Sequence, residues 1–325
     1  MNLPRRQFLQ LAAAAAAIPV VSYGALAQNY PNRPVKWIVP FPAGGTTDLV
    51  ARLLGQWLSE RLSQPVVIEN KPGGGTNIAV QAVVSAPPDG YTLLFILSTN
   101  AINVSLYKSL PFDFQSDIVP VAALAELPLV LIANNDLPAK NVPEFVAYAK
   151  AHPGKLNVGS FGARTVAHLA IELLKSSTGI DVVHVPYRGS ALLVSDLLSG
   201  RIQAGIDALP NVLPHSRSGA MRALAVLAPQ RTPALPDMPT MGETIKGYEV
   251  STWSGVGIPK GTPDAIVERL NREINAGLQD PGITARLAQV GAVPIIVTPA
   301  ELRARIAADT DKWAKVVKAA GIKPD

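Results

Sequence analysis

The chain has 325 residues, of which 48% are hydrophobic and 16% are charged. This length and composition indicate a globular protein with a sizeable core, and they suggest two domains more readily than one. The absence of cysteine excludes disulfides, a lipidated cysteine anchor and thiolate metal sites. The formal net charge is only +5, and without a basic run or an aromatic-basic stripe nothing indicates nucleic-acid binding.

Residues 1–27 are typical of a secretory signal peptide. Arg5 and Arg6 precede the apolar run LAAAAAAIPVV at 11–21, and Ala25-Leu26-Ala27 matches an A-x-A cleavage site. A membrane anchor is the alternative, but this run is shorter than the about 20 residues that span a bilayer. We expect twin-arginine-like export, cleavage after about Ala27, and a soluble, monomeric periplasmic protein. Its net charge would be near +3, from 27 basic and 24 acidic residues.

After this segment, short β-rich runs alternate with helical patterns. Strands are predicted at 35–41, 65–71 and 91–97, with helices at 48–62 and 73–86 between them. This β-α-β-α-β order predicts a parallel sheet covered by helices.

The pattern then restarts with a helix at 143–152. The strands that follow are 156–160, 181–187, 202–208 and 222–228, with helices at 167–178 and 191–200. A strand at 251–259 and two helices with Thr-Pro starts, at 262–280 and 298–320, complete the chain. Because these two helices lack strands of their own, we expect them to pack on the first unit.

The predicted fold class is therefore α/β, with two α/β lobes, two crossovers and a ligand cleft at the carboxyl ends of the strands. Beyond the signal peptide, lobe 1 is predicted to comprise 28–125 and 252–325, and lobe 2 to comprise 126–251. The chain would cross between the lobes near 125–134 and 250–256.

Motif spacing gives no support for a catalytic or metal site. The sequence has no G-x-S-x-G, and Gly44-Gly45-Thr46-Thr47 lacks the lysine of a P-loop and the G-x-G-x-x-G pattern. The four histidines are not spaced as zinc ligands: His152, His168, His184 and His215. We therefore expect no catalytic residue, no metal and no cofactor.

Small polar residues and glycines recur instead where predicted strands lead into helices. They occupy 41–48, 98–100, 159–168 and Asp207-Ala208. Backbone N–H groups at helix starts, together with hydroxyls, suit a carboxylate. Each turn also has a purely structural interpretation, in which glycines permit tight turns, Asp48 caps its helix and His168 packs or caps. We interpret a further glycine run, KPGGGTN, as a structural turn.

Several longer motifs occur together in one order: YPNRPVKWIVPFPAGGTTDLVARLL, VVIENKPGGGTNIA, PDGYTLL, GARTVAHLAIELLKSSTGIDVVHVPYRGSA, RALAVLAPQRTPALPDMPT and GIPKGTPDAIVERLN. In this combination, over about 30–325, the chain resembles the Bug receptors, the extracytoplasmic substrate-binding proteins of tripartite tricarboxylate transporters. The resemblance implies a type II periplasmic-binding-protein fold that closes on a small ligand and delivers it to a membrane permease. The ligand it implies is a di- or tricarboxylate, an acidic amino acid or an aromatic acid.

Carried over position by position, the resemblance assigns ligand contacts to both lips of the cleft. On lobe 1 they are Phe41, Ala43, Gly44, Asp48, Thr99 and Asn100. On lobe 2 they are Ser160, Gly162, Thr165, His168 and Asp207, to which we add Arg164 as a candidate.

Several positions depart from the family pattern, and three positions of the turn at 160–167 have lost the polarity that the family has there. Arg164 stands where the family has a turn glycine, and Ala208 stands where it often has Asn. Arg164 either grips a second ligand carboxylate bidentately, or points to solvent or pairs with a nearby acid. If the turn requires a positive φ, arginine adopts it only at a cost in free energy.

The sequence thus predicts a receptor that holds a carboxylate without transforming it, because a ligand bridging both lips would favour the closed lobes. Three other functions stay open: an orphan receptor that feeds a sensor kinase, a secreted enzyme on the same fold, and a ligand-sensing regulator. The regulator should carry a DNA-binding helix-turn-helix and no signal peptide, which is the opposite of this pattern.

Overall fold

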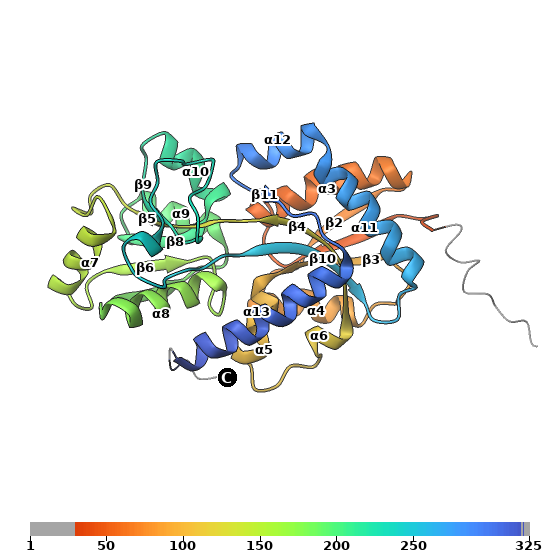
Figure 1. The fold of residues 1–325 in the computed structure, drawn as a ribbon, viewed down its shortest axis with the longest axis horizontal. Helices are drawn as coiled ribbons and strands as arrows, with labels where there is room; N and C mark the ends of the chain where they lie inside the picture. The colour runs from red at the N-terminus through yellow and green to blue at the C-terminus, as the bar shows by residue number, and fades with distance from the viewer. Residues whose placement is uncertain (1–29, 320, 322–325) are drawn as a thin grey trace, which may run out of the picture.

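The computed structural model describes residues 30–319 and 321, and the predicted signal peptide lies outside them. Two β-sheets, each covered by helices, form two units side by side in this part of the chain (Figure 1). The α/β fold class predicted from the sequence is confirmed.

The first sheet has the strand order β11-β4-β10-β3-β1-β2. Its strands are β1 (Val35–Val39), β2 (Val66–Asn70), β3 (Thr92–Leu97), β4 (Ile118–Glu126), β10 (Trp253–Pro259) and β11 (Val293–Pro294). The predicted parallel pairing of β1 with β2 and β3 is confirmed, whereas β10 runs antiparallel between β3 and β4.

The second sheet has the order β7-β6-β8-β5-β9. Its strands are β5 (Leu129–Ala133), β6 (Asn157–Ser160), β7 (Val183–Pro186), β8 (Ala204–Ala208) and β9 (Arg222–Val226). β6 pairs in parallel with β7 and β8, and β5 runs antiparallel to β8 and β9. Neither β4 nor β5 was assigned from the sequence, because their nearly continuous apolar runs lack the alternation that marks a half-exposed strand.

Helices surround both sheets. Those around the first sheet are α3 (Thr46–Leu62), α4 (Asn77–Val84), α5 (Ser98–Leu106), α6 (Phe114–Asp117), α11 (Asp264–Gln279), α12 (Pro281–Gln289) and α13 (Pro299–Ala319), with a 3-10 turn η1 (Gly74–Thr76). Those around the second are α7 (Val142–Ala151), α8 (Val166–Thr178), α9 (Ser190–Leu198) and α10 (Leu209–Arg217), with η2 (Met241–Glu243). No helix in the described ranges combines the length and the apolar character needed to cross a bilayer.

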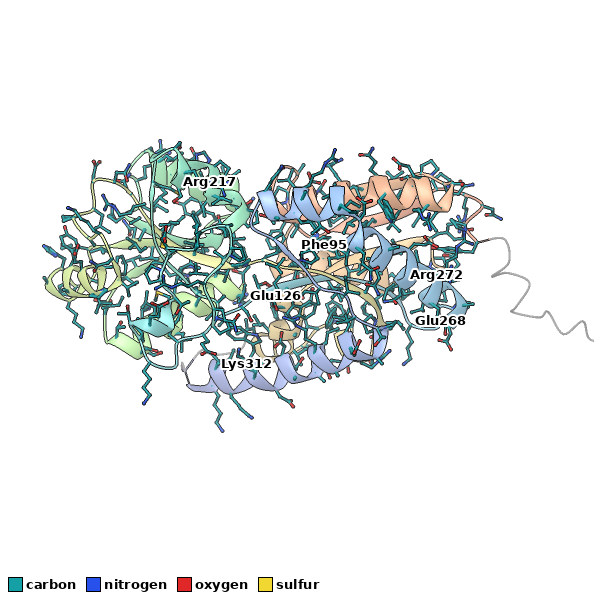
Figure 2. The ribbon with its side chains drawn as sticks, turned by 45° about the horizontal axis from the view of Figure 1, so that its top comes forward. Phe95, Glu126, Arg217, Glu268, Arg272 and Lys312 are labelled. Carbon is teal, nitrogen blue, oxygen red and sulfur yellow. The ribbon has the colours of Figure 1, made fainter. Side chains whose placement is uncertain are left out.

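β1 shows how the first sheet buries both of its faces. Side chains alternate along a strand, so Trp37 and its neighbours two residues away pack in the cluster that contains α3 and α11. Ile38 points the other way, into a cluster with α4 and α13. The exposed side chains of Glu268 and Arg272 on α11 and of Lys312 on α13 lie on the outside of these helices (Figure 2).

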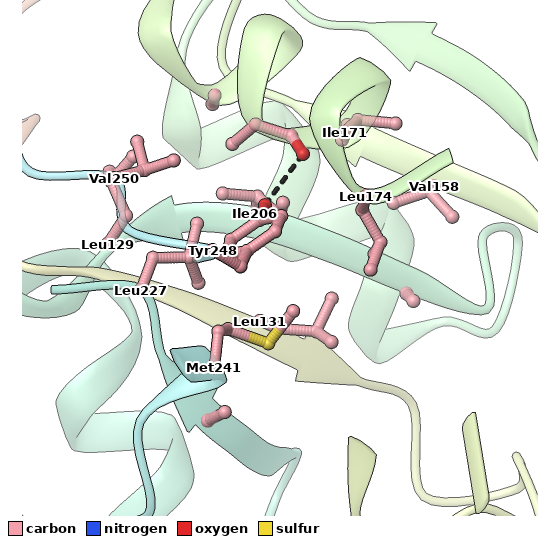
Figure 3. Packing of buried hydrophobic residues seen from close by; sticks show 14 of the residues in the cluster. Leu129, Leu131, Val158, Ile171, Leu174, Ile206, Leu227, Met241, Tyr248 and Val250 are labelled. Atoms are coloured by element: carbon pink, nitrogen blue, oxygen red, sulfur yellow. Dashed lines mark hydrogen bonds between the residues drawn. The ribbon is translucent and has the colours of Figure 1, made fainter. Parts of the chain in front are cut away.

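The second unit has its own core, in which aliphatic side chains of β5 and β8 pack against α8. Tyr248 is buried there and donates a 2.6 Å hydrogen bond to the carbonyl of Ala170 (Figure 3). Burial raises the pKa of its phenol, so the hydroxyl stays a donor. This bond satisfies the only polar atom that the tyrosine side chain brings into the core.

The chain passes between the sheets twice, after β4 and before β10. The two connecting segments lie side by side, since Leu127 N–H donates to the carbonyl of Thr252 at 3.0 Å. Two short connecting segments that lie side by side in this way can act as a hinge. We therefore keep the predicted lobe boundaries as a proposal for which residues move together as one lobe.

The C-terminal helices depart in part from their predicted packing. Leu302 and Ile306 of α13 do join a core cluster of the first sheet. Trp313 and Val317 instead join the cluster that continues through α5 into the second sheet. α13 has 21 residues. At a rise of about 1.5 Å per residue, the helix extends beyond the first sheet and reaches the second unit. We also expected no strand to accompany these two C-terminal helices. The structure has the short strand β11 between them, and it pairs with β4.

Candidate functional site

A cavity of about 200 Å³ lies between the two units, and both contribute to its wall. The lining residues are Phe41, Pro42, Ala43, Gly45, Thr46, Thr47, Leu97, Thr99, Leu127, Leu129, Phe161, Val166, Arg188, Gly189, Ser190, Ala191, Leu192, Asp207, Ala208, Asn211 and Thr252. The hinge segments form part of the wall, since Leu127 and Thr252 belong to them.

Five helices begin at this cavity. N-cap or first-turn residues of α3, α5, α8, α9 and α10 all belong to the wall. The first N–H groups of a helix have no partner within the helix, and the helix dipole makes that end positive. A cavity at which five such ends meet favours an anion.

The turn before α3 owes its shape to Gly44 and Asp48. Gly44 has a φ of +85°, which glycine adopts without steric cost. Its N–H donates to Asp48 Oδ2 at 2.9 Å, and Asp48 also accepts from Arg52 Nε at 2.9 Å and from Asn70 Nδ2 at 3.0 Å. Burial alone would raise the pKa of Asp48, but these hydrogen bonds outweigh it and leave the pKa lowered.

Asp48 therefore lies behind the turn, outside the cavity wall. Its side chain is only 3% exposed, and its hydrogen bonds link α3 to the turn and to the end of β2. A direct ligand contact by Asp48 stays a prediction, and we infer that its main contribution is to hold the turn in shape.

The turn before α8 is held by internal hydrogen bonds in the same way. Ser160 Oγ lies 3.0 Å from the carbonyl of Gly162 and 2.7 Å from His184 Nε2, and Thr165 Oγ1 donates to that same carbonyl at 2.8 Å. Arg164 N–H donates to His168 Nδ1 at 3.1 Å. These side chains form the framework of the turn and stay outside the cavity wall.

Arg164 adopts the left-handed conformation considered for this position, with a φ of +59°. Its guanidinium lies over the ring of Tyr107 on α5, 5.0 Å from the centroid. Such a contact is a favourable cation–π interaction. The side chain is not among the residues that line the cavity, and its grip on a second carboxylate stays a prediction.

His168 and His184 stack with their ring centroids 4.1 Å apart. Burial lowers the pKa of His168, and Lys175 lowers it further, although Glu172 opposes the shift. Burial also lowers the pKa of His184, and with His168 and Lys175 nearby it reaches about 3. Both rings are therefore neutral near pH 7, which fits a packing role.

Asp207 is fully buried near the end of β8, two residues before α10 begins, and is the one acidic residue among the described residues of the wall. Its Oδ1 accepts from Ser190 Oγ, Ala208 N and Asn211 Nδ2 at 2.7, 2.6 and 2.9 Å. Its Oδ2 has no hydrogen-bond partner within the described residues. Burial raises its pKa to about 6, against the effect of these hydrogen bonds.

The two lips touch directly. Thr46 on α3 donates from its N–H and its hydroxyl to Asn211 Oδ1, at 3.1 and 2.7 Å. Phe41 and Phe161 meet edge to face at 5.9 Å between centroids. The structure therefore has the lobes in contact around the cavity.

The structure brings four of the predicted contact residues into the wall: Phe41, Ala43, Thr99 and Asp207. The others are not among the described residues that line the cavity: Gly44, Asp48, Asn100, Ser160, Gly162, Arg164, Thr165 and His168. For these eight, contact with a ligand stays a prediction.

Sequence reasoning missed a fifth turn, Arg188-Gly189-Ser190, between β7 and α9. It follows a predicted strand and precedes a predicted helix, so the signal used for the other turns also applied here. Asn211 and Thr252 were missed as well, because no local motif marks them.

Comparison with known proteins identifies the family. The model of the tripartite tricarboxylate transporter family receptor matches residues 50–322. The chain belongs to this receptor family. It is 41% identical over 302 residues to Protein BugT of Bordetella pertussis, which covers 91% of this chain and 92% of that protein.

Two solved structures extend the similarity to the fold. R. palustris Rpa4515 with adipate has a TM-score of 0.88 at 38% identity, covering 91% of this chain and 100% of that chain. The periplasmic binding protein BugD has a TM-score of 0.87 at 35% identity, with the same coverage. The predicted membership in the Bug family and the type II periplasmic-binding-protein fold are thereby confirmed. The relatives are substrate-binding receptors.

Proposed function

We propose that the protein captures a small carboxylate between its lobes and delivers it to the permease of a tripartite tricarboxylate-type transporter. The observation that carries this proposal is the meeting of five helix starts at one cavity. In such a site, backbone N–H groups hold the carboxylate and no chemical step follows. The adipate in Rpa4515, a related chain, supports an acid as the ligand.

The wall also indicates the kind of acid. Phe41, Phe161 and Leu97 are among the apolar residues that form most of it, and they suit an apolar ligand body. Arg188 is the one cationic residue among the described residues of the wall, and its side chain is exposed. It forms no hydrogen bond or ion pair with the rest of the described chain. A carboxylate at the mouth of the cavity would therefore find a guanidinium available.

We further propose that the mature protein, from about residue 28, acts in the periplasm as a monomer. The sequence of 1–27 and the similarity to a periplasmic binding protein support this location. An orphan receptor that feeds a sensor kinase is the second candidate, because it would use the same cavity and differ only in its partner. Neighbouring genes would discriminate the two.

A thermal-shift screen tests the proposal. Residues 28–325 would be refolded to remove carried-over ligand and screened with mono-, di- and tricarboxylates, acidic amino acids and aromatic acids. A ligand at 1,000 times its Kd adds about 4 kcal/mol to the free energy of unfolding. We expect a rise of several degrees for at least one acid, without turnover of that acid. Turnover would instead support a secreted enzyme.

A further inference from the structure

Asn211 uses every hydrogen-bonding position of its carboxamide, and these bonds join the two lobes. Its Oδ1 accepts from Thr46 N–H at 3.1 Å and from Thr46 Oγ1 at 2.7 Å. Its Nδ2 donates to Ser190 Oγ at 2.7 Å and to Asp207 Oδ1 at 2.9 Å. Thr46 lies on α3 beside the first sheet, whereas the other three residues surround the second.

The contact with Thr46 has the form of a helix cap. Thr46 is the first residue of α3, and the N-cap residue Gly45 has no side chain with which to accept its N–H groups. Asn211 supplies the missing acceptor from the opposite lobe. Opening the cleft would remove this acceptor from α3.

The carboxamide is already oriented before it meets Thr46. Both hydrogen bonds from Nδ2 are made within lobe 2, to Ser190 and Asp207, and these bonds do not require the closed cleft. Because the acceptor oxygen is held in place, little side-chain entropy is lost when the lobes meet.

We propose that Asn211 is a closure latch that caps α3 across the cleft and so stabilises the closed lobes. This role goes beyond ligand capture, since the latch acts between protein groups and contributes whichever acid the cavity holds. It makes Asn211 a positioning residue that sets the ratio of closed to open protein, and through that ratio the apparent affinity.

The distance between the lobes tests the latch without any ligand. The chain contains no cysteine, so Gln56→Cys on α3 and Ser195→Cys on α9 allow specific spin labelling of two exposed positions. Pulsed electron paramagnetic resonance in acid-free buffer then gives the distance distribution of the refolded mature chain. Loss of a helix cap corresponds to about a fivefold change in an equilibrium constant. We therefore expect Asn211→Ala to lower the ratio of closed to open protein about fivefold.

Asn135→Ala is the matched control, because Asn135 bonds to Gly219 on the outside of lobe 2. Thr46→Val, which removes one of the two donors, should open the lobes less than Asn211→Ala. In the double variant, Thr46→Val should add little to Asn211→Ala. Thr46→Val alone keeps the proposal testable should Asn211→Ala fail to fold, because it removes the hydrogen bond from Thr46 Oγ1 to Asn211 Oδ1 without changing Asn211.

Three results would overturn the latch. The first is a distance distribution of the wild type that shows no closed form. The second is a distance distribution of Asn211→Ala equal to that of Asn135→Ala. The third is a double variant in which the effects of Thr46→Val and Asn211→Ala on the ratio of closed to open protein add in full. An opening caused by Asn211→Ala in a protein that binds no acid would support the latch while refuting the proposed function.

Discussion

The backbone N–H of Arg164 donates to Nδ1 of His168, which lies 3.1 Å away in the first turn of α8. The bond requires an unprotonated Nδ1, and the stacking of His168 on His184 favours neutral rings as well. Two uncharged imidazoles thus help to hold this turn in shape.

The first prediction is a loss of stability in acid that depends on this pair. The folded-state pKa of both histidines is lowered, and that of His184 is about 3. The unfolded chain therefore binds more protons below about pH 6.5, and the stability present above that pH declines as the pH falls towards 3. Urea unfolding of wild type and His184→Asn at pH 7.5, 6 and 5 should show a smaller decline in the variant.

His152→Asn is the control for this experiment, because His152 is exposed. Asp207 acts in the opposite direction, since its raised pKa of about 6 favours the folded state in acid. Only the difference between variant and wild type is therefore informative. Equal declines in His184→Asn and wild type would show that the pair does not titrate on unfolding.

The second prediction concerns the turn before α3. Asp48→Ala leaves the Gly44 N–H and the Asn70 amide without their acceptor, and we expect a cost of about 1–3 kcal/mol in the free energy of unfolding. Acid affinity should also fall, because the turn forms part of the cavity wall. Denaturant unfolding and calorimetric titration check the two effects.

Arg52→Ala provides the comparison for Asp48→Ala. Arg52 is more than half exposed, so its ion pair with Asp48 should contribute at most about 1 kcal/mol. If Asp48→Ala were as mild as Arg52→Ala, the carboxylate would not be what holds the turn.

The third prediction separates the two interpretations of Arg164. Arg164→Gly relieves a φ of +59°, which costs a non-glycine residue about 1–2 kcal/mol, but it also loses the side-chain contacts of Arg164, among them the one with Tyr107. We therefore expect a net gain in stability that is smaller than this value. Acid affinity should be unchanged, as the side chain lies outside the wall. A tenfold loss of affinity with no gain in stability would restore Arg164 as a ligand residue.

The fourth prediction concerns Arg188. Removal of a guanidinium that bonds to a carboxylate costs about 1.5 kcal/mol or more, so Arg188→Ala should weaken acid binding at least about tenfold. Arg201→Ala is the control, since Arg201 is exposed on the same lobe and pairs with Asp196. Equal affinities of the two variants would place the carboxylate away from Arg188.

Local chemistry made part of this site predictable from the sequence. The step from β1 through the glycine turn to α3 was recognisable because strand, turn and helix each leave a local pattern. Asp48 illustrates the limit of such patterns: its position marked a helix start, but not whether its carboxylate faces the cavity or the turn. That depends on Asn70, which comes from another strand.

The contacts between the lobes could not be predicted in this way. Thr46 and Asn211 are 165 positions apart, and their hydrogen bonds depend on how two separate sheets come together. Arg188 was visible in the sequence, since its turn also leads from a predicted strand into a predicted helix. The turns that line the cavity can thus be recognised from the local sequence. The arrangement of the two lobes that brings these turns together cannot.

Calorimetric titration with matched acids and amides tests the central claim most directly. The refolded mature chain would be titrated with adipate and with adipamide, which keeps the apolar body but replaces both carboxylates. Benzoate and benzamide form a second pair with a single carboxylate. We expect at least one acid to bind and its amide to bind at least about 100-fold more weakly, since each lost charged hydrogen bond costs about 1.5–3 kcal/mol. An amide that binds as tightly as its acid would contradict a carboxylate site.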